Sequence, residues 1–155
     1  MLMIHKNNVP KQRGFSLVEV LIALVIMSVG MLGIAGLYVQ SMQAGRTATF
    51  RHHAVTLAGD VADRIRANPR AAGAYTAVGG ADSGCVATGI TCNQAEMAAH
   101  DIFLWTQQAQ ESLPAGTVTI TFDGTVTPPT YEIEIAWVEA GENLDYTILI
   151  PVLAI

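Results

Sequence analysis

The longest feature of the hydrophobic pattern is one apolar block near the start of the chain. Residues 15–39 read FSLVEVLIALVIMSVGMLGIAGLYV, and Glu19 is the single charged side chain among them. A helix of about 20 apolar residues crosses the ~30 Å hydrocarbon core of a bilayer. The pattern therefore predicts a membrane-spanning helix with one carboxylate near its N-terminal end.

Basic residues flank only one side of this block. Lys6, Lys11 and Arg13 precede it, and the next basic residue is Arg46. Because positive charge is retained on the cytoplasmic side, we expect a cytoplasmic N-terminus and a periplasmic or extracellular body from about residue 40. The block is longer than the roughly 7–15-residue core of a secretory signal. A simple signal anchor is left open by composition alone.

A helical pattern continues beyond the membrane segment. Residues 40–67 contain no proline, and Asn68 followed by Pro69 forms the first stop signal. We therefore predict one helix over residues 15–67, about 80 Å long at ~1.5 Å per residue. In its second half, the apolar positions expected to face a core are Val55, Ala58, Ala62 and Ile65.

A second helix is predicted over residues 94–113. It follows a segment at 70–93, rich in Gly, Ala, Ser and Thr, that we interpret as a surface loop. Asn93 and Glu96 have the spacing of an N-terminal capping box, and Pro114 ends the pattern. The expected apolar face consists of Ala98, Ile102, Trp105, Ala109 and Leu113.

The last part of the chain changes to the period-two alternation that is typical of half-buried strands. The inward positions are expected to be Val118, Ile120 and Phe122, then Tyr131, Ile133, Ile135 and Trp137, then Leu144, Tyr146, Ile148 and Ile150. Turn-rich stretches separate the three segments, which predicts an antiparallel meander with one solvated face. The expected fold class is therefore α+β: a long N-terminal helix, membrane-spanning in its first half, packed on a small antiparallel sheet with a second helix.

The chain has two cysteines, Cys85 and Cys92, with six residues between them. A zinc site would need further ligands nearby, and a thioredoxin-type centre would need two intervening residues. We interpret the pair as a disulfide that closes a small loop, which requires an oxidising compartment. Two unrelated free thiols are the alternative.

The charge balance argues against one class of partner, nucleic acid. The whole chain carries a formal charge of -5, and the part after Gly14 has five arginines against all thirteen carboxylates, 5 − 13 = −8. An acidic body gives no electrostatic basis for broad nucleic-acid binding. We expect no nucleic-acid partner, and no metal-binding or cofactor-binding pattern stands out.

No constellation of side chains points to catalysis. The histidines at 52–53 are adjacent on a helix and face different directions, so they make a poor metal pair. His100 beside Asp101 has no accompanying nucleophile motif. Glu132 and Glu134 share a strand face, which is typical of a solvated sheet surface. We therefore expect a protein that is not an enzyme, with a signal-anchored periplasmic enzyme or binding domain as the alternative from another class.

The residues at the start of the apolar block match a known processing signature. Lys-Gln-Arg-Gly14 followed by Phe15-Ser-Leu-Val-Glu19-Val-Leu-Ile-Ala-Leu resembles the type IV prepilin signature, in which a basic leader ending in Gly precedes Phe and a Glu at the fifth mature position. The resemblance implies that a prepilin peptidase cuts between Gly14 and Phe15 and methylates the new Phe15 amine. It also implies a type IV pilin-like lollipop fold.

A physical reason for the glutamate suits this resemblance. A carboxylate inside the hydrocarbon costs at least ~2.5 kcal/mol on insertion scales, so it usually has a partner. The cationic Phe15 amine of a neighbouring subunit would neutralise Glu19, and their attraction is stronger in a medium of low dielectric. We interpret both as assembly residues. The alternative is a Glu19 that lies near the interface, or is protonated, and has no role.

The head carries a second resemblance, to the minor pilins of the type IV pilus modification protein PilV family. This family shares its general pattern with a minor pseudopilin of type II secretion. The similar segments are Asp101-Ile-Phe-Leu-Trp105, Leu113-Pro-Ala-Gly116 and Tyr131-Glu-Ile-Glu-Ile-Ala-Trp137.

Together the resemblances imply a minor pilin that helps to initiate or prime filament assembly. Its parts would be a cleaved leader (1–14), a transmembrane and filament-core helix segment (15–39) and a periplasmic head (40–155) that includes the rest of the helix (40–67). The implied partners are other minor and major pilins, prepilin peptidase, the inner-membrane assembly machinery and membrane lipid. The implied location is the inner membrane and the extracellular pilus. A minor pseudopilin of a type II secretion system is the alternative.

Overall fold

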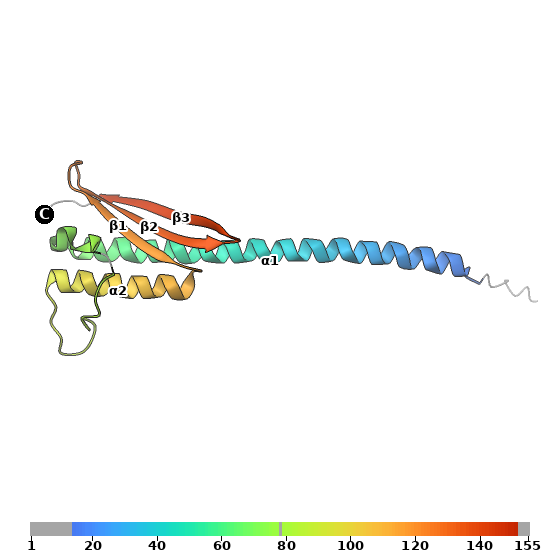
Figure 1. The fold of residues 1–155 in the computed structure, drawn as a ribbon, viewed down its shortest axis with the longest axis horizontal. Coiled ribbons are helices and arrows are strands. Elements are labelled where there is room, and N and C mark those ends of the chain that lie inside the picture. The colour runs from blue at the N-terminus through green and yellow to red at the C-terminus, as the bar shows by residue number, and fades with distance from the viewer. Residues whose placement is uncertain (1–13, 78, 152–155) are drawn as a thin grey trace, which may run out of the picture. The chain divides into compact units, whose positions relative to one another are not determined.

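The computed structural model describes residues 14–77 and 79–151. The basic residues of the expected leader, Lys6, Lys11 and Arg13, lie outside the described residues. The elements, in chain order, are α1 (Leu17–Ala67), the 3-10 helix η1 (Pro69–Thr76), α2 (Gln94–Ser112), β1 (Thr117–Asp123), β2 (Thr130–Glu139) and β3 (Glu142–Pro151) (Figure 1). The expected α+β class, with a long N-terminal helix, a second helix and a small antiparallel sheet, is confirmed.

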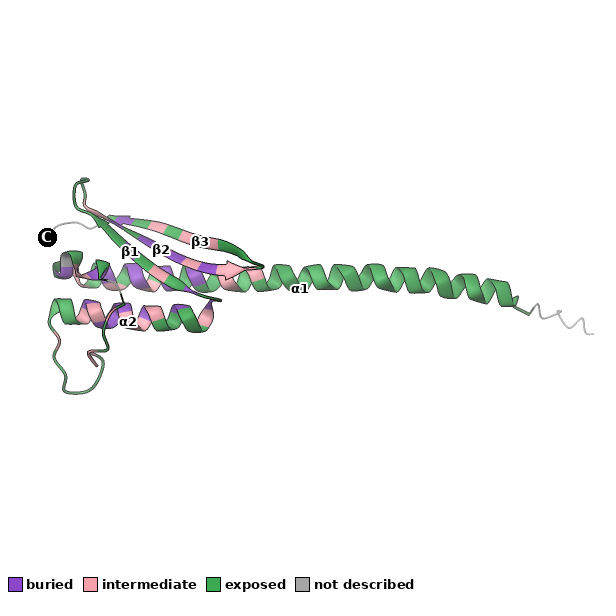
Figure 2. Ribbon diagram, viewed as in Figure 1, coloured by how far each residue is buried: buried purple, intermediate pink, exposed green. Residues whose placement is uncertain are grey.

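The chain divides into two compact units, Met1–Gln43 and Ala44–Ile155. In the first unit, every described side chain of α1 is exposed, as Figure 2 shows in green. Within the part of the chain that the structure describes, α1 is the helix long and apolar enough to cross a membrane, with a mean hydropathy of 2.6 over its most apolar window. An exposed apolar surface of this length is stable only where lipid or other apolar helices cover it.

The helix begins slightly later than predicted, at Leu17 and not at Phe15. Ser16 explains the difference, because its side-chain oxygen accepts a hydrogen bond from the Val18 amide (3.4 Å) and its carbonyl accepts one from the Val20 amide (3.2 Å). Serine commonly caps a helix in this way. Phe15 therefore precedes the regular helix.

In the second unit, the second half of α1 belongs to the core. Its buried residues are Ala54, Leu57, Ala58, Val61, Ala62 and Ile65. These positions share one core with side chains of α2 and the sheet. Three of the four expected core positions are confirmed, but Val55 is wrong, since it is 46% exposed. The buried face of α1 is centred on Ala54, Leu57 and Val61. It begins at Ala54, one residue before the predicted start at Val55, and Val55 lies at its margin.

Helix α1 ends at Ala67, as the Asn68–Pro69 stop signal predicts. The predicted surface loop at 70–93 is only partly correct, because η1 occupies its beginning. Ala71 and Tyr75 of η1 are buried in the core. Proline at the first position of η1 provides a preset φ angle. The sequence misses this burial because it depends on contacts of Tyr75 with Asp101 and Trp105 of α2 and not on a local pattern.

Helix α2 agrees closely with its prediction. The Asn93 side chain accepts hydrogen bonds from the amides of Ala95 (3.0 Å) and Glu96 (2.9 Å), and the Glu96 carboxylate accepts one from the Asn93 amide (2.9 Å). This is the expected capping box. All five positions of the predicted apolar face are buried.

Replacing Asn93 by Ala should lower the free energy of unfolding of the head by about 1 kcal/mol, because two amides at the start of α2 lose their acceptor. Urea unfolding of the detergent-solubilised chain, followed by tryptophan fluorescence, measures the change. Gln107→Ala, on the exposed face of the same helix, is the matched control and should shift stability by less than about 0.5 kcal/mol. Equal midpoints for wild type and Asn93→Ala would contradict the capping role.

The three strands form the predicted antiparallel meander in the order β1-β2-β3. Ile120 of β1, Ile133 of β2 and Ile148 of β3 lie side by side in the register. The predicted inward positions of β2 are all buried. Phe122 is an exception on β1, since its ring is exposed and packs against Tyr131 with centroids 4.6 Å apart.

Burial is greatest on the central strand β2 and lower on the two edge strands. On β3, Ile150 is buried, while Leu144, Tyr146 and Ile148 are only half-buried. At the other side of the sheet, Gly116 lets the chain enter β1 tightly against α2, because a Cβ at this position would collide with the Ala109 carbonyl oxygen. Helix α2 and η1 therefore contact the sheet on its β1 side.

Candidate functional site

The expected processing site lies in an accessible segment ahead of α1. Gly14 is exposed, and no heavy atom lies within 4 Å of the position that a Cβ would occupy there. Phe15 is 83% exposed. The peptide bond between them therefore lies in non-helical backbone. A peptidase can bind such a segment in an extended conformation.

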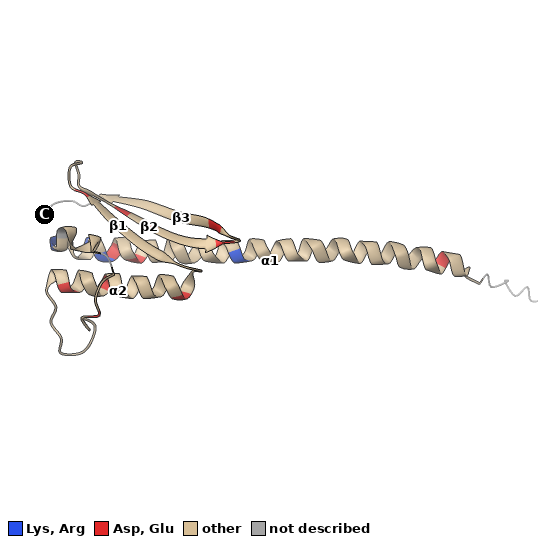
Figure 3. Cartoon of the chain, in the orientation of Figure 1, with Lys and Arg blue, Asp and Glu red and all other residues tan. Residues whose placement is uncertain are grey.

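Glu19 lies in the first turn of α1. Carboxylates near a helix N-terminus are favoured by the helix dipole, typically by about 0.3–1 kcal/mol. Glu19 is the single charged residue between positions 15 and 39, and Figure 3 shows the N-terminal part of α1 in tan apart from one red position. Glu19 makes no hydrogen bond or ion pair with any residue that the structure describes. Residues 14–77 and 79–151 therefore provide no partner for this carboxylate within the same chain.

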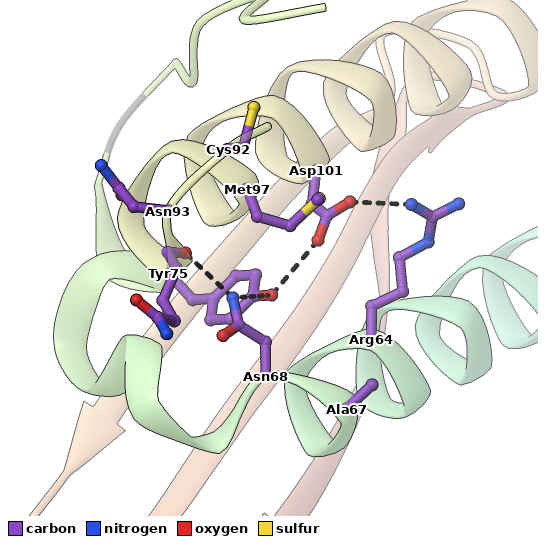
Figure 4. A pocket seen from close by; sticks show the side chains of 9 residues that line it. Arg64, Ala67, Asn68, Tyr75, Cys92, Asn93, Met97 and Asp101 are labelled. Atoms are coloured by element: carbon purple, nitrogen blue, oxygen red, sulfur yellow. Dashed lines mark hydrogen bonds and ion pairs between the residues drawn. The ribbon is translucent and has the colours of Figure 1, made fainter. Parts of the chain in front are cut away.

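The head contains a polar cluster that the sequence does not reveal. Asp101 of α2 has only 3% of its side chain exposed. Its Oδ1 accepts a hydrogen bond from Arg64 Nη1 of α1 (2.7 Å), and its Oδ2 accepts one from the Tyr75 hydroxyl of η1 (3.2 Å) (Figure 4). One buried carboxylate thus joins three elements.

Further polar contacts extend this cluster on both sides. Arg64 Nε lies 3.3 Å from Asp60 Oδ2, and the same oxygen accepts a hydrogen bond from Trp105 Nε1 (2.8 Å). Asn68 Nδ2 donates to the Tyr75 hydroxyl (3.2 Å) and to the Gln94 carbonyl (2.9 Å). A pocket of about 370 Å³ lies beside these groups (Figure 4).

The electrostatics of the cluster favour a structural role. Partial burial acts to lower the pKa of Arg64, but the hydrogen bond to Asp101 and the charge of Asp60 outweigh it, so the pKa is raised. Burial raises the pKa of Tyr75 to about 12, against the opposing hydrogen bond from Asn68. Both side chains therefore hold their protons throughout the physiological range, and neither is suited to act as a general base.

Replacing Tyr75 by Phe should remove part of the alkaline instability of the head. The folded chain retains the Tyr75 proton between about pH 10 and 12 while the unfolded chain loses it, so stability is full below this window and falls as pH rises through it. The maximum slope from one such group is about 1.4 kcal/mol per pH unit.

Urea midpoints measured from pH 8 to pH 11 give this slope for wild type and Tyr75→Phe. The variant should be less stable at pH 8, because Asp101 loses a donor, and should show a flatter alkaline fall. A residual slope is expected from Tyr131, whose pKa burial also raises. Identical slopes in both proteins would contradict the assignment.

The histidine–aspartate pair considered from the sequence does not form a dyad. The Asp101 carboxylate is directed to Arg64 and Tyr75. His100 is buried, and its Nδ1 lies 3.3 Å from Asp82 Oδ1 in the preceding loop. Cys85 and Cys92 are joined in a disulfide within that loop. No group of three or more potential metal ligands occurs in residues 14–77 and 79–151.

Comparison with known families adds an independent line of evidence. A family model described as the prokaryotic N-terminal methylation motif matches residues 9–35, and one described as type IV pilin Tt1218 matches residues 36–103. No curated protein and no solved structure matches the chain.

The methylation motif and the apolar helix α1 together define a membrane-anchored, single-pass protein. The adjoining pilin match and the α+β head then identify the chain as a type IV pilin-like protein. Membership in this class points to a structural subunit that interacts with other pilins and with pilus machinery.

Proposed function

We propose that this chain is a minor pilin subunit of a type IV pilus that helps to initiate or prime filament assembly. The observation that carries the proposal is Glu19, a carboxylate that has no partner among the described residues and lies in the first turn of an exposed apolar helix. It lies five residues after Gly14, inside the matched methylation motif. An apolar helix with one carboxylate in this place is suited to lateral packing against identical or similar helices.

The first step in this proposal is processing at the cytoplasmic face of the inner membrane. Prepilin peptidase removes residues 1–14 by cutting the bond between Gly14 and Phe15, and it methylates the new amine. The accessible backbone at both residues supports this step. The methylated amine remains cationic, so a positive charge is now held next to the start of an apolar helix.

Assembly then follows from charge pairing and apolar packing. The segment 15–39 leaves lipid and enters a bundle of filament helices. There the Phe15 amine of one subunit pairs with Glu19 of its neighbour, and the low dielectric strengthens the attraction. The pairing sets the axial stagger between adjacent helices. The head, residues 40–155, lies in the periplasm and then on the pilus.

The resemblance to PilV supports the minor-pilin assignment through segments of α2 and β2 that carry Trp105 and Trp137. Both tryptophans are buried in the head, so they serve its packing. The same resemblance favours a second candidate, the minor pseudopilin of a type II secretion system, because that subunit shares the general pattern.

A deletion strain, complemented with the intact gene, distinguishes the two systems. Loss of surface pili and twitching motility with normal enzyme export supports the type IV pilus. Loss of export with normal piliation supports type II secretion. Normal piliation and normal export together would contradict both candidates and favour an anchored periplasmic domain.

A further inference from the structure

The two edges of the head sheet differ in how they are covered. Strand β1 contacts η1 and α2 along one edge. Strand β3 forms the opposite edge, and among the described residues its one partner strand is β2, in a register that runs without interruption from Thr130↔Pro151 to Glu139↔Glu142. A long, regular edge strand presents a row of backbone donors and acceptors that can pair with another strand.

A groove lies beside this edge, between α1 and the first half of β3. Its volume is about 430 Å³, and it is lined by Arg51, Val55, Trp137, Leu144, Asp145 and Tyr146. The walls are mainly apolar. Val55 is the α1 residue that the sequence places in the core and the structure leaves exposed. Leu144 and Tyr146 are two of the three inward residues of β3 that remain half-buried.

The unsatisfied polar groups of the groove are donors. Arg51 makes no ion pair or hydrogen bond with any residue that the structure describes. Trp137 also lines the groove, and its indole Nε1 is buried without an acceptor among those residues. The one carboxylate in the lining, Asp145, accepts a hydrogen bond from the Thr147 hydroxyl (3.3 Å). A guanidinium and an indole N–H both require acceptors, and a carboxylate is the strongest partner for the guanidinium.

We propose that this groove and the free edge of β3 bind an extended segment of another filament subunit, one that carries an acidic side chain opposite Arg51. The segment adds a strand to the sheet beside β3, places alternate apolar side chains on Val55, Leu144 and Tyr146, and supplies a carboxylate acceptor to Arg51. An extended backbone fits better than a helix, because only a strand can pair with the backbone of β3. The inference rests on the proposed function, since it takes its partner from the same filament.

Site-specific photo-crosslinking in filament-producing cells tests whether the groove binds such a segment. The probe p-benzoylphenylalanine replaces Val55 in the groove or, as a control, Val86 in the exposed disulfide loop. Mass spectrometry then maps the crosslinked peptide. The Val55 probe should join to an extended, acidic segment of another filament subunit, and the Val86 probe should not give this product.

A charge change makes the test specific to the groove. Arg51→Glu should lower the yield of the Val55 adduct about tenfold or more, since the acidic side chain is then repelled. Arg70→Glu, at an exposed position of η1, should leave the yield unchanged. No adduct, an adduct to lipid or to a helix, or an Arg51→Glu yield equal to wild type would overturn the proposal.

The N-terminus of the same preparation separates this inference from the proposed function. If Phe15 is the methylated first residue and the chain is in filaments while the groove gives no adduct, the groove proposal fails and the pilin assignment stands. If the leader is intact and no filaments form, the proposed function itself has failed. Membrane levels of Arg51→Glu equal to wild type show that the variant folds.

Discussion

Replacing Asp101 by Asn should lower the free energy of unfolding of the head by about 2–4 kcal/mol. The substitution keeps the size of the side chain but removes the charge that Arg64 Nη1 contacts at 2.7 Å. Removing one partner of a fully buried ion pair costs roughly 3–5 kcal/mol. The expected value is smaller because 41% of the Arg64 side chain is exposed, so its charge can be solvated, and because Asp60 remains as a partner.

The measurement is a urea titration of the detergent-solubilised chain. Trp105 and Trp137 are the two tryptophans of the protein and both are buried in the head, so fluorescence reports its unfolding. Asp63→Asn is the matched control. Asp63 is 81% exposed and pairs with Arg66 on the same face of α1, so the change should be less than about 0.5 kcal/mol. Similar decreases in the free energy of unfolding for both variants would contradict the prediction that the buried Asp101 ion pair stabilises the head more than an exposed one.

Replacing Glu19 by Ala should reduce incorporation into filaments about tenfold or more while leaving membrane insertion intact. Insertion depends on the apolar length of α1, which Ala does not diminish. Incorporation depends on pairing between Glu19 and the Phe15 amine of a neighbour. A loss of about 1.4 kcal/mol in this contact is tenfold in an equilibrium constant, and desolvated pairs are worth more than exposed ones.

The amounts of the chain in sheared pili and in membranes, compared by quantitative immunoblotting, give the result. Glu19→Gln serves as a size-matched control. If charge is the essential property, Gln should behave like Ala. If only size or polarity matters, Gln should restore incorporation. Normal incorporation of both variants would support the alternative that Glu19 has no role in assembly.

The elements with local signals could be predicted from the sequence. Pro69 and the Asn93–Glu96 capping box specify the end of α1 and the start of α2 through backbone groups only a few residues away. Alternation along β2 gives its inward face directly, because side chains in a strand point to opposite sides in turn. Hydrophobic length alone is enough to identify the apolar half of α1.

Other features depend on contacts between distant residues. Asp101 has His100 as its polar neighbour in the sequence, but in the fold its carboxylate meets Arg64, which is 37 positions away. The spacing of Asp60 and Arg64 was the one available signal, since residues four apart on a helix are neighbours. The burial of Tyr75 likewise depends on how η1 packs, and its segment has the composition of a loop.

The exposure of Val55 has a similar origin. Apolar residues that recur every three or four positions locate the buried face of a helix only to within about one residue, because a helical turn has 3.6 residues and not a whole number. The position of α2 in the head then decides which side of the apolar face of α1 is buried. Val55 lies on the side of the groove beside β3.

The most direct test of the pilin account is the mass of the N-terminal peptide from native protein extracted from membranes. The account expects a peptide that begins at Phe15 and carries one methyl group on its amine. An intact leader, or a first residue beyond the apolar block at 15–39, would contradict the account and return the chain to the anchored or secreted periplasmic proteins.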